Sequence, residues 1–281
     1  MPTSPSPRRG AKAQQPAPRP AEPRSLWPRL ALIGIAALIA IVVCVLPASM
    51  ITRFLPASVR AEDFSGSVWH GSADRIIANG RPAGALEWHV HPLALARLHL
   101  VADLHWVKGG FVLDGSADVA RGHVAASGIS GGGPMEDLRD FGLGTGWRGS
   151  VGVNIAELTA DLSATGTALT SAIGDITVSG VSSAQVASGA NLGGYDLRFN
   201  DPASAAGAGA DMSAALADTG GPLAVNATIQ LSMKTRTGLF SGTVKERPDA
   251  SPALRSQLDN LAQLHARDIE GRLPVDLEFT F

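Results

Sequence analysis

The 281-residue chain has little cysteine, few aromatic residues and few charges. Its one cysteine, Cys44, rules out a disulfide within the chain and any metal cluster built on several cysteines. Charged residues make up 17% of the chain, where about a quarter is usual for soluble domains. Together with 32 glycines and many small side chains, this composition favours β-structure over a helical bundle.

The net charge of −2 and the isoelectric point near 6.4 give no sign of nucleic-acid binding. The sequence also lacks a Ser/His/Asp signature, a G-x-S-x-G element and a phosphate-binding loop. Gly131–Gly133 is glycine-rich but lacks the phosphate-binding context, so we expect a loop there. Because the acidic residues are scattered, we predict no catalytic, cofactor-binding or metal-binding residues, no cofactor and no enzymatic activity.

The longest hydrophobic run, Leu30–Leu46, has 17 residues and no charge. As a helix it would span roughly 26 Å, close to the ~30 Å hydrocarbon core of a bilayer. The residues before it carry six basic side chains and one acidic side chain (Arg8, Arg9, Lys12, Arg19, Arg24 and Arg29, against Glu22). This charge bias predicts a transmembrane helix over 26–50 with a cytoplasmic N-terminus and a periplasmic domain over 51–281.

Two alternatives to a retained membrane helix fit less well. A cleaved signal peptide needs small residues at positions −1 and −3, but the candidate sites place Leu46 or Pro47 at −3. A buried core helix would need a polar face, which Leu30–Leu46 lacks. Residues 1–25 are rich in Pro, Ala, Ser and Arg, and we expect a disordered cytoplasmic tail.

Alternation of apolar and polar residues recurs after the hydrophobic run, which predicts antiparallel strands with one buried face. Clear examples lie at 86–91, 98–106, 223–234 and 275–281, and Lys108-Gly109-Gly110 predicts a turn. We therefore expect a mainly β domain over 64–281, with a strongly twisted antiparallel sheet. In the Ala/Gly-rich stretch 163–221, part of the chain looks irregular, especially Asn200–Gly221, with a mobile loop over Pro202–Gly209.

One helix is predicted over Ser251–His265. Ser251-Pro252 supplies an N-cap and a first-turn proline. The leucines that follow form one apolar stripe, which we expect to be buried against the sheet: Leu254, Leu258, Leu261 and Leu264. A short helical turn is expected at Met135–Phe141.

Histidines and tryptophans are the remaining candidate binding residues. His89 and His91 share one strand face, and His99 and His105 lie on the polar face of the next strand. Paired strands could bring these rings to a metal, but no carboxylate is spaced to orient them, so a solvated polar face is the preferred interpretation. Four tryptophans (Trp69, Trp88, Trp106 and Trp147) are expected mainly in the core rather than in a ligand groove.

Two segments carry a resemblance to a known family. Gly66-Ser67-Val68-Trp69-His70-Gly71-Ser72-Ala73 fits a G-x-V-W-x-G-x-A element, and Trp88, Pro92, Leu93 and Leu95 fit a W-x-x-x-P-L-x-L element. With the closing segment Asp268–Leu273, the chain resembles the type II secretion system protein N (general secretion pathway protein N) family. The resemblance implies an accessory inner-membrane component that binds other type II secretion proteins in the periplasm, without catalytic residues.

An alternative function remains open at this point. Long antiparallel sheets can curl into apolar grooves, which would make the protein an anchored periplasmic lipid-handling or lipid-transfer protein. That function needs an apolar sheet face that stays uncovered. The predicted helix could cover such a face, which favours protein–protein interaction.

Overall fold

The computed structural model describes residues 46–280, except 142, 144, 164–165, 185, 200–211, 233–234, 236 and 264–266. The predicted tail, most of the predicted 26–50 helix, Cys44, the 202–209 loop, Leu264 and Phe281 lie outside the described residues. Within the described part, no helix combines the length and apolar character that crossing a bilayer requires.

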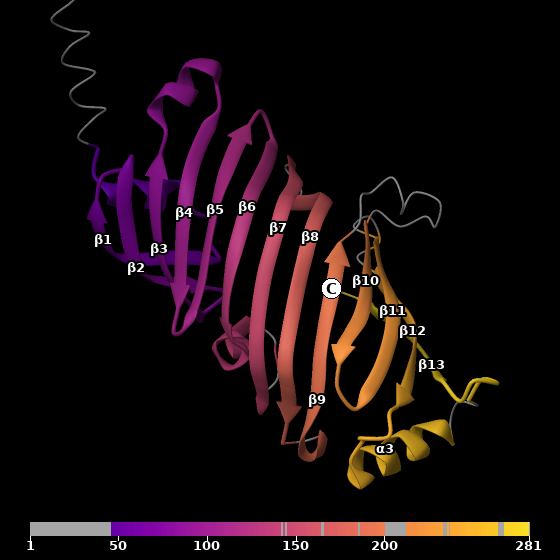
Figure 1. Cartoon of the computed structure of the whole chain (residues 1–281). Coiled ribbons are helices and arrows are strands. Elements are labelled where there is room, and N and C mark those ends of the chain that lie inside the picture. Colours follow the sequence, from indigo (N-terminus) through magenta and orange to yellow (C-terminus); the bar gives the residue numbers. More distant parts are fainter. Residues whose placement is uncertain are drawn as a thin grey trace, which may run out of the picture. The chain divides into compact units, whose positions relative to one another are not determined.

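The described residues form one antiparallel sheet of thirteen strands, in which each strand pairs with its neighbours in the sequence (Figure 1). This arrangement confirms the predicted mainly β, antiparallel fold. The strands are β1 (Val59–Gly66), β2 (His70–Ala78), β3 (Arg81–Val90), β4 (Leu100–Lys108), β5 (Phe111–Ala120), β6 (His123–Pro134), β7 (Trp147–Ser163), β8 (Gly166–Ser183), β9 (Val186–Phe199), β10 (Met212–Gly220), β11 (Leu223–Ser232), β12 (Thr237–Glu246) and β13 (Leu273–Thr280).

The sheet has one apolar face and one polar face because apolar residues fall opposite one another across neighbouring strands. Trp88 of β3 lies opposite Leu104 of β4, and Trp106 of β4 lies opposite Leu113 of β5. The same face continues through β11 to β13, where Phe240 lies between Ile229 and Leu277. Cross-strand contacts of this kind are the main stabilising unit of a sheet.

Gly131–Gly133 lies within β6, so the predicted loop there is wrong. A Cβ atom at Gly131 would collide with the carbonyl oxygen of Val112, and one at Gly132 with that of Val151. Both residues also have positive φ angles, of 144° and 157°. Glycine is therefore needed here so that β5 and β7 can approach the distorted β6 backbone.

The segment 200–221 is also more regular than its composition indicates. Met212–Gly220 forms β10, whose buried side chains include Met212 and Ala214. Small residues are compatible with this strand because it is paired on both sides, by β9 and β11. The remainder, 200–211, lies outside the described residues.

Short helices pack at the margins of the sheet. The 3₁₀ helix η1 (Ala48–Phe54) contacts β1 and β2, and η2 (Pro92–Arg97) connects β3 to β4. The predicted turn at Met135–Phe141 is confirmed as the 3₁₀ helix η3, which packs against β3, β6 and β7.

The helix α3 (Pro252–Ala262) begins as predicted, with the Ser251 hydroxyl accepting a hydrogen bond from the Leu254 backbone N–H at 3.2 Å. Leu254 and Leu258 are buried, but Leu261 is 49% exposed, so the prediction of a fully buried stripe is wrong. The reason is position: α3 packs against β9 and lies beside the strand ends, not across the sheet face (Figure 1).

The two described leucines of α3 provide a matched stability test. Leu258→Ala should lower the free energy of unfolding by about 2–5 kcal/mol because it removes buried methyl groups and leaves a cavity. Leu261→Ala should change it by less than about 0.5 kcal/mol because that side chain is half exposed. Denaturant unfolding of the full chain in micelles measures both, and equal losses would contradict this placement of α3.

Candidate functional site

The two segments that carry the family resemblance meet near the β1 edge of the sheet. The Trp88 indole N–H donates a hydrogen bond to the Val68 carbonyl oxygen at 3.0 Å. Gly71 lies opposite Trp88, and a Cβ atom at Gly71 would come within 2.8 Å of the Trp88 ring. Trp88 is only 7% exposed, so glycine at 71 leaves space for a buried indole. The hydrogen bond of this indole to Val68 also holds the turn between β1 and β2.

The turn between β1 and β2 completes this junction. Gly66 has a φ of 79°, and the Ser67 N–H donates to the His70 carbonyl at 2.9 Å. Trp69 is half-buried and packs against the cluster of Ala48, Ala73, Trp88 and Val90. The prediction that Trp69 contributes to the core is therefore confirmed.

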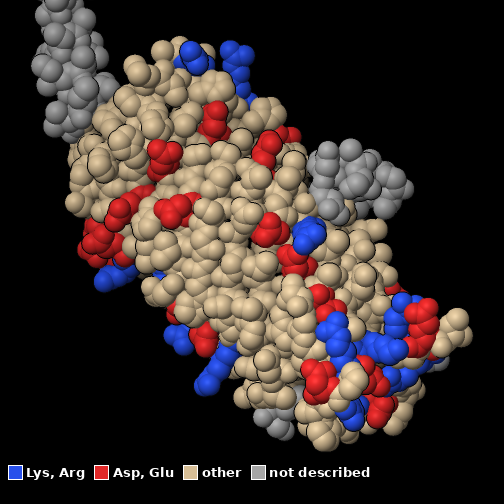
Figure 2. All heavy atoms as spheres, in the orientation of Figure 1, with Lys and Arg blue, Asp and Glu red and all other residues tan. Residues whose placement is uncertain are grey.

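The closing segment Asp268–Leu273 forms a braced turn before β13. The Asp268 carboxylate accepts backbone hydrogen bonds from Glu270 at 2.9 Å and from Arg272 at 2.8 Å. It also pairs with the Arg272 guanidinium at 2.9 Å. The Arg272 backbone and side chain keep the pKa of the Asp268 carboxyl below its usual range. This segment belongs to a mixed ion-pair cluster beside α3 and β13, visible in Figure 2.

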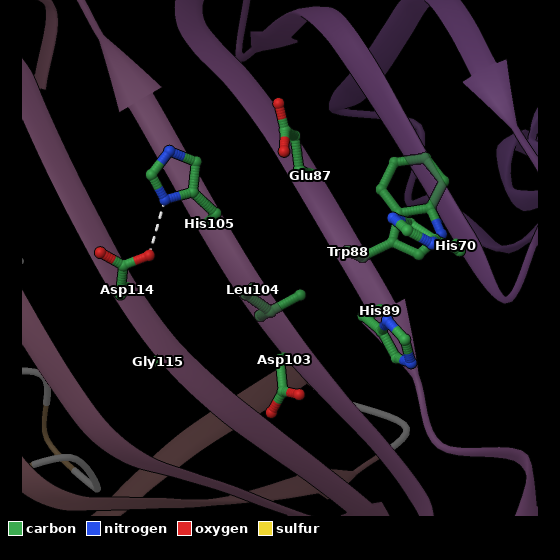
Figure 3. Close-up of a pocket in the computed structure, with 9 residues that line it drawn as sticks. All are labelled: His70, Glu87, Trp88, His89, Asp103, Leu104, His105, Asp114 and Gly115. Carbon is green, nitrogen blue, oxygen red and sulfur yellow. Dashed lines mark hydrogen bonds and ion pairs between the residues drawn. The ribbon is translucent and has the colours of Figure 1, made fainter.

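The polar face of β2–β5 carries a shallow cavity of about 240 Å³ lined by histidine and acidic side chains (Figure 3). His70 and His89 lie with their ring centroids 5.1 Å apart, and His89 and His91 are 5.3 Å apart. The strands thus bring together three imidazoles, of which the sequence analysis had singled out two.

Carboxylates pair with four histidines of the polar face, which corrects the expectation that none was suitably spaced. Each pair joins two neighbouring strands or their ends: His91–Asp103 at 2.8 Å, His99–Asp118 at 3.0 Å, His105–Asp114 at 2.6 Å and His123–Asp161 at 2.6 Å. The sequence analysis missed these aspartates. The signal for one pair was present, because a two-residue turn at Gly109-Gly110 places His105 opposite Asp114.

The histidines of the polar face lie on several strands and do not converge on one point. Among the described residues, no group of three or more His, Cys, Asp or Glu side chains is arranged to hold a metal ion. His99 and His105 each contact their own aspartate, and His105 lines the shallow cavity together with His70 and His89. The polar face therefore presents separate histidine–aspartate pairs.

The apolar face contains two cavities lined only by hydrophobic residues. The first, here called the N-terminal cavity, has a volume of about 440 Å³ and is lined by η1, the adjoining Leu55, Val68 and β1–β4. The second, the central cavity, has a volume of about 590 Å³ and lies between β3–β8 and η3, with Trp106 and Phe141 among its lining residues. Both volumes fall in the range of small-molecule sites. Because α3 packs at the strand ends, it does not cover these cavities.

The two edges of the sheet differ. In β1, Asp63 has a φ of 57°, and Ser67, just beyond the strand, pairs with Pro47. Among the described residues, β13 pairs only with β12, has no positive φ angle and is exposed from Asp276 to Thr280. β13 is therefore the less protected edge, and such edges can accept another strand.

The fold and these surfaces define a mainly β protein with an open antiparallel sheet, one apolar face and one polar face. Residues 57–276 match the family model for type II secretion system (T2SS) protein N. Because the match covers well over half of the sequence, the chain belongs to this family, and the resemblance stated from its segments is confirmed. A search of the curated proteins found no match, and neither did a search of the solved structures.

The His105–Asp114 pair predicts a specific pH dependence. The hydrogen bond to Asp114 raises the pKa of His105 above its ordinary value of 6.5, against a smaller opposing effect of burial. The pair's stabilisation is thus fully present below about pH 6.5 and is lost as the pH rises through the folded-state pKa. In NMR titrations of the full chain, Asp114→Asn should lower the His105 pKa. Asp276→Asn, on distant β13, should leave it unchanged, and equal effects would contradict the assignment.

Proposed function

We propose that this protein is an accessory inner-membrane component of the type II secretion machinery that acts through protein–protein contacts in the periplasm. Family membership supports a role in type II secretion. The single structural observation in favour of protein contacts is the regular, exposed edge of β13. A partner strand added there would gain backbone hydrogen bonds without any rearrangement of the sheet. We propose binding, not catalysis, as its activity.

The proposed topology is a single membrane-spanning helix within 26–50, a cytoplasmic tail over 1–25 and a periplasmic domain over 51–281. Support comes from the uncharged Leu30–Leu46 run and the basic residues that precede it. Partners in this arrangement are other type II secretion proteins and the inner membrane, and no nucleic acid is expected.

This topology is tested by protease accessibility. Protease added to spheroplasts should digest the domain beyond Arg53 and leave a small fragment that contains Leu30–Leu46. The same protease should leave a cytoplasmic marker protein intact, which controls for lysis. Protection of the whole chain would rule out a periplasmic domain.

A second candidate function is lipid handling, in which the sheet holds acyl chains on its apolar face. The observation in its favour is the pair of wholly apolar cavities that α3 leaves uncovered. Hydrocarbon suits such walls because they offer no hydrogen-bond partner to a peptide backbone.

One purification from membranes distinguishes the two functions. A photo-crosslinking residue at Glu278 on β13 should link the chain to other secretion proteins, whereas the same residue at exposed Thr228, inside the sheet on β11, should not. Bound proteins and lipids are identified together by mass spectrometry. Stoichiometric lipid without crosslinked secretion proteins would overturn the protein-contact function in favour of lipid handling.

A further inference from the structure

The connection between β3 and β4 exposes a group of leucines. Leu93 is 87% exposed and Leu98 is 68% exposed, and Leu95 and Leu100 are also among the exposed hydrophobic residues. None of the residues of η2 is buried. Clustered exposed leucines of this kind mark a contact with another apolar surface.

The backbone of this connection is held by its own hydrogen bonds. The Leu98 N–H donates to the Leu95 carbonyl at 2.9 Å, and the His99 N–H donates to the Ala94 carbonyl at 3.2 Å. Pro92 at the start of η2 and the left-handed Leu98 at its end further restrict the conformation. The segment projects beyond the ends of β3 and β4 at the top of Figure 1. The leucines are thus presented by an ordered loop.

The loop lies at the end of the sheet where the hydrophobic run Leu30–Leu46 joins the described domain. The Leu46 carbonyl accepts a hydrogen bond from the Val68 N–H at 2.9 Å, and the Trp69 carbonyl accepts one from the Val90 N–H at 2.6 Å. Val90 ends β3 and lies two residues before η2. The last residue of the hydrophobic run is therefore connected to the base of the leucine loop through only two adjacent backbone hydrogen bonds.

We propose that the loop Pro92–Leu100, here called the leucine loop, inserts into the periplasmic leaflet of the inner membrane beside the membrane-spanning segment; this proposal rests on the proposed topology. The leucines supply apolar surface. Arg97, which forms no ion pair among the described residues, supplies a cation for lipid phosphates. Helix and loop then attach the sheet to the bilayer at two points.

Insertion also has a consequence for the N-terminal cavity. Leu100 belongs to the leucine loop and lines that cavity. η1, which contributes Ile51 to the same cavity, begins two residues after the hydrophobic run. A membrane-inserted leucine loop therefore places the mouth of the N-terminal cavity at the bilayer surface, where acyl chains are the available apolar ligand.

The experiment uses the full chain, purified and reconstituted in vesicles of phosphatidylethanolamine and phosphatidylglycerol. In a Cys44→Ser background, Leu93→Cys carries a polarity-sensitive fluorophore. The matched control is Ile269→Cys, because Ile269 is a fully exposed aliphatic residue in the turn before β13, at the opposite edge of the sheet. Spin-labelled lipids should quench the probe at 93 several-fold more strongly than the probe at 269. Adding Leu95→Asp and Leu98→Asp should abolish that difference.

Equal, weak quenching at 93 and 269 would overturn the proposal. A probe on the native Cys44 distinguishes failure of the leucine loop proposal from failure of the proposed topology. If the Cys44 probe is quenched and the probe at 93 is not, the leucine loop proposal fails while the membrane-spanning segment stands. If neither is quenched, the topology itself fails. A probe at 93 that is shielded in native membranes but not in the vesicles would indicate a protein partner and would also overturn the proposal.

Discussion

The rest of the structure depends on the alternation of apolar and polar side chains along antiparallel strands, maintained through an uninterrupted meander. Because side chains on successive residues point to opposite sides, the register places most apolar side chains of neighbouring strands on the same face. Most domains cover such a face with a second layer of structure. In the described part of this chain, η1, η3 and α3 cover only parts of it. The remaining apolar surface is therefore available to something other than the chain's own core.

The segments that carry the family resemblance stabilise the first strands of the sheet and the turn before its last strand. Trp88, Gly71 and Val68 secure the first strands of the sheet, and Asp268 and Arg272 brace the turn into its last strand. A buried indole needs a partner for its N–H and space for its ring, and both come from the other segment. Their roles are architectural.

The proposed contacts use separate parts of the molecule. β1 and β13 are twelve strand spacings apart, which at about 4.8 Å each is roughly 58 Å along the sheet. Binding of a partner strand at β13 and insertion of the leucine loop next to β3 therefore do not compete for space. The His91–Asp103 and His105–Asp114 pairs on the polar face lie at β3–β5, near the leucine loop, where they join neighbouring strands by exposed, solvent-screened interactions.

Much of the local structure could be predicted because it depends on neighbouring residues. Alternation identified the strands at 86–91, 98–106, 223–234 and 275–281, and Ser251-Pro252 identified the start of α3. The Gly109-Gly110 turn sets a register from which the His105–Asp114 pair follows by counting. The composition of Gly131–Gly133 was misleading, because glycine is common in loops but also permits close approach between strands.

The sequence by itself determined the fold class, the family and which residues share a strand face, since these depend on local periodicity and short segments. Only the tertiary structure decided that α3 lies at the strand ends, that His123 meets Asp161 and that the leucine loop lies beside Leu46. These features depend on contacts between residues far apart in the sequence, such as His123 and Asp161, which are 38 positions apart, and local patterns do not encode such contacts. The physical reason is that strand register and close packing are collective properties of the whole sheet.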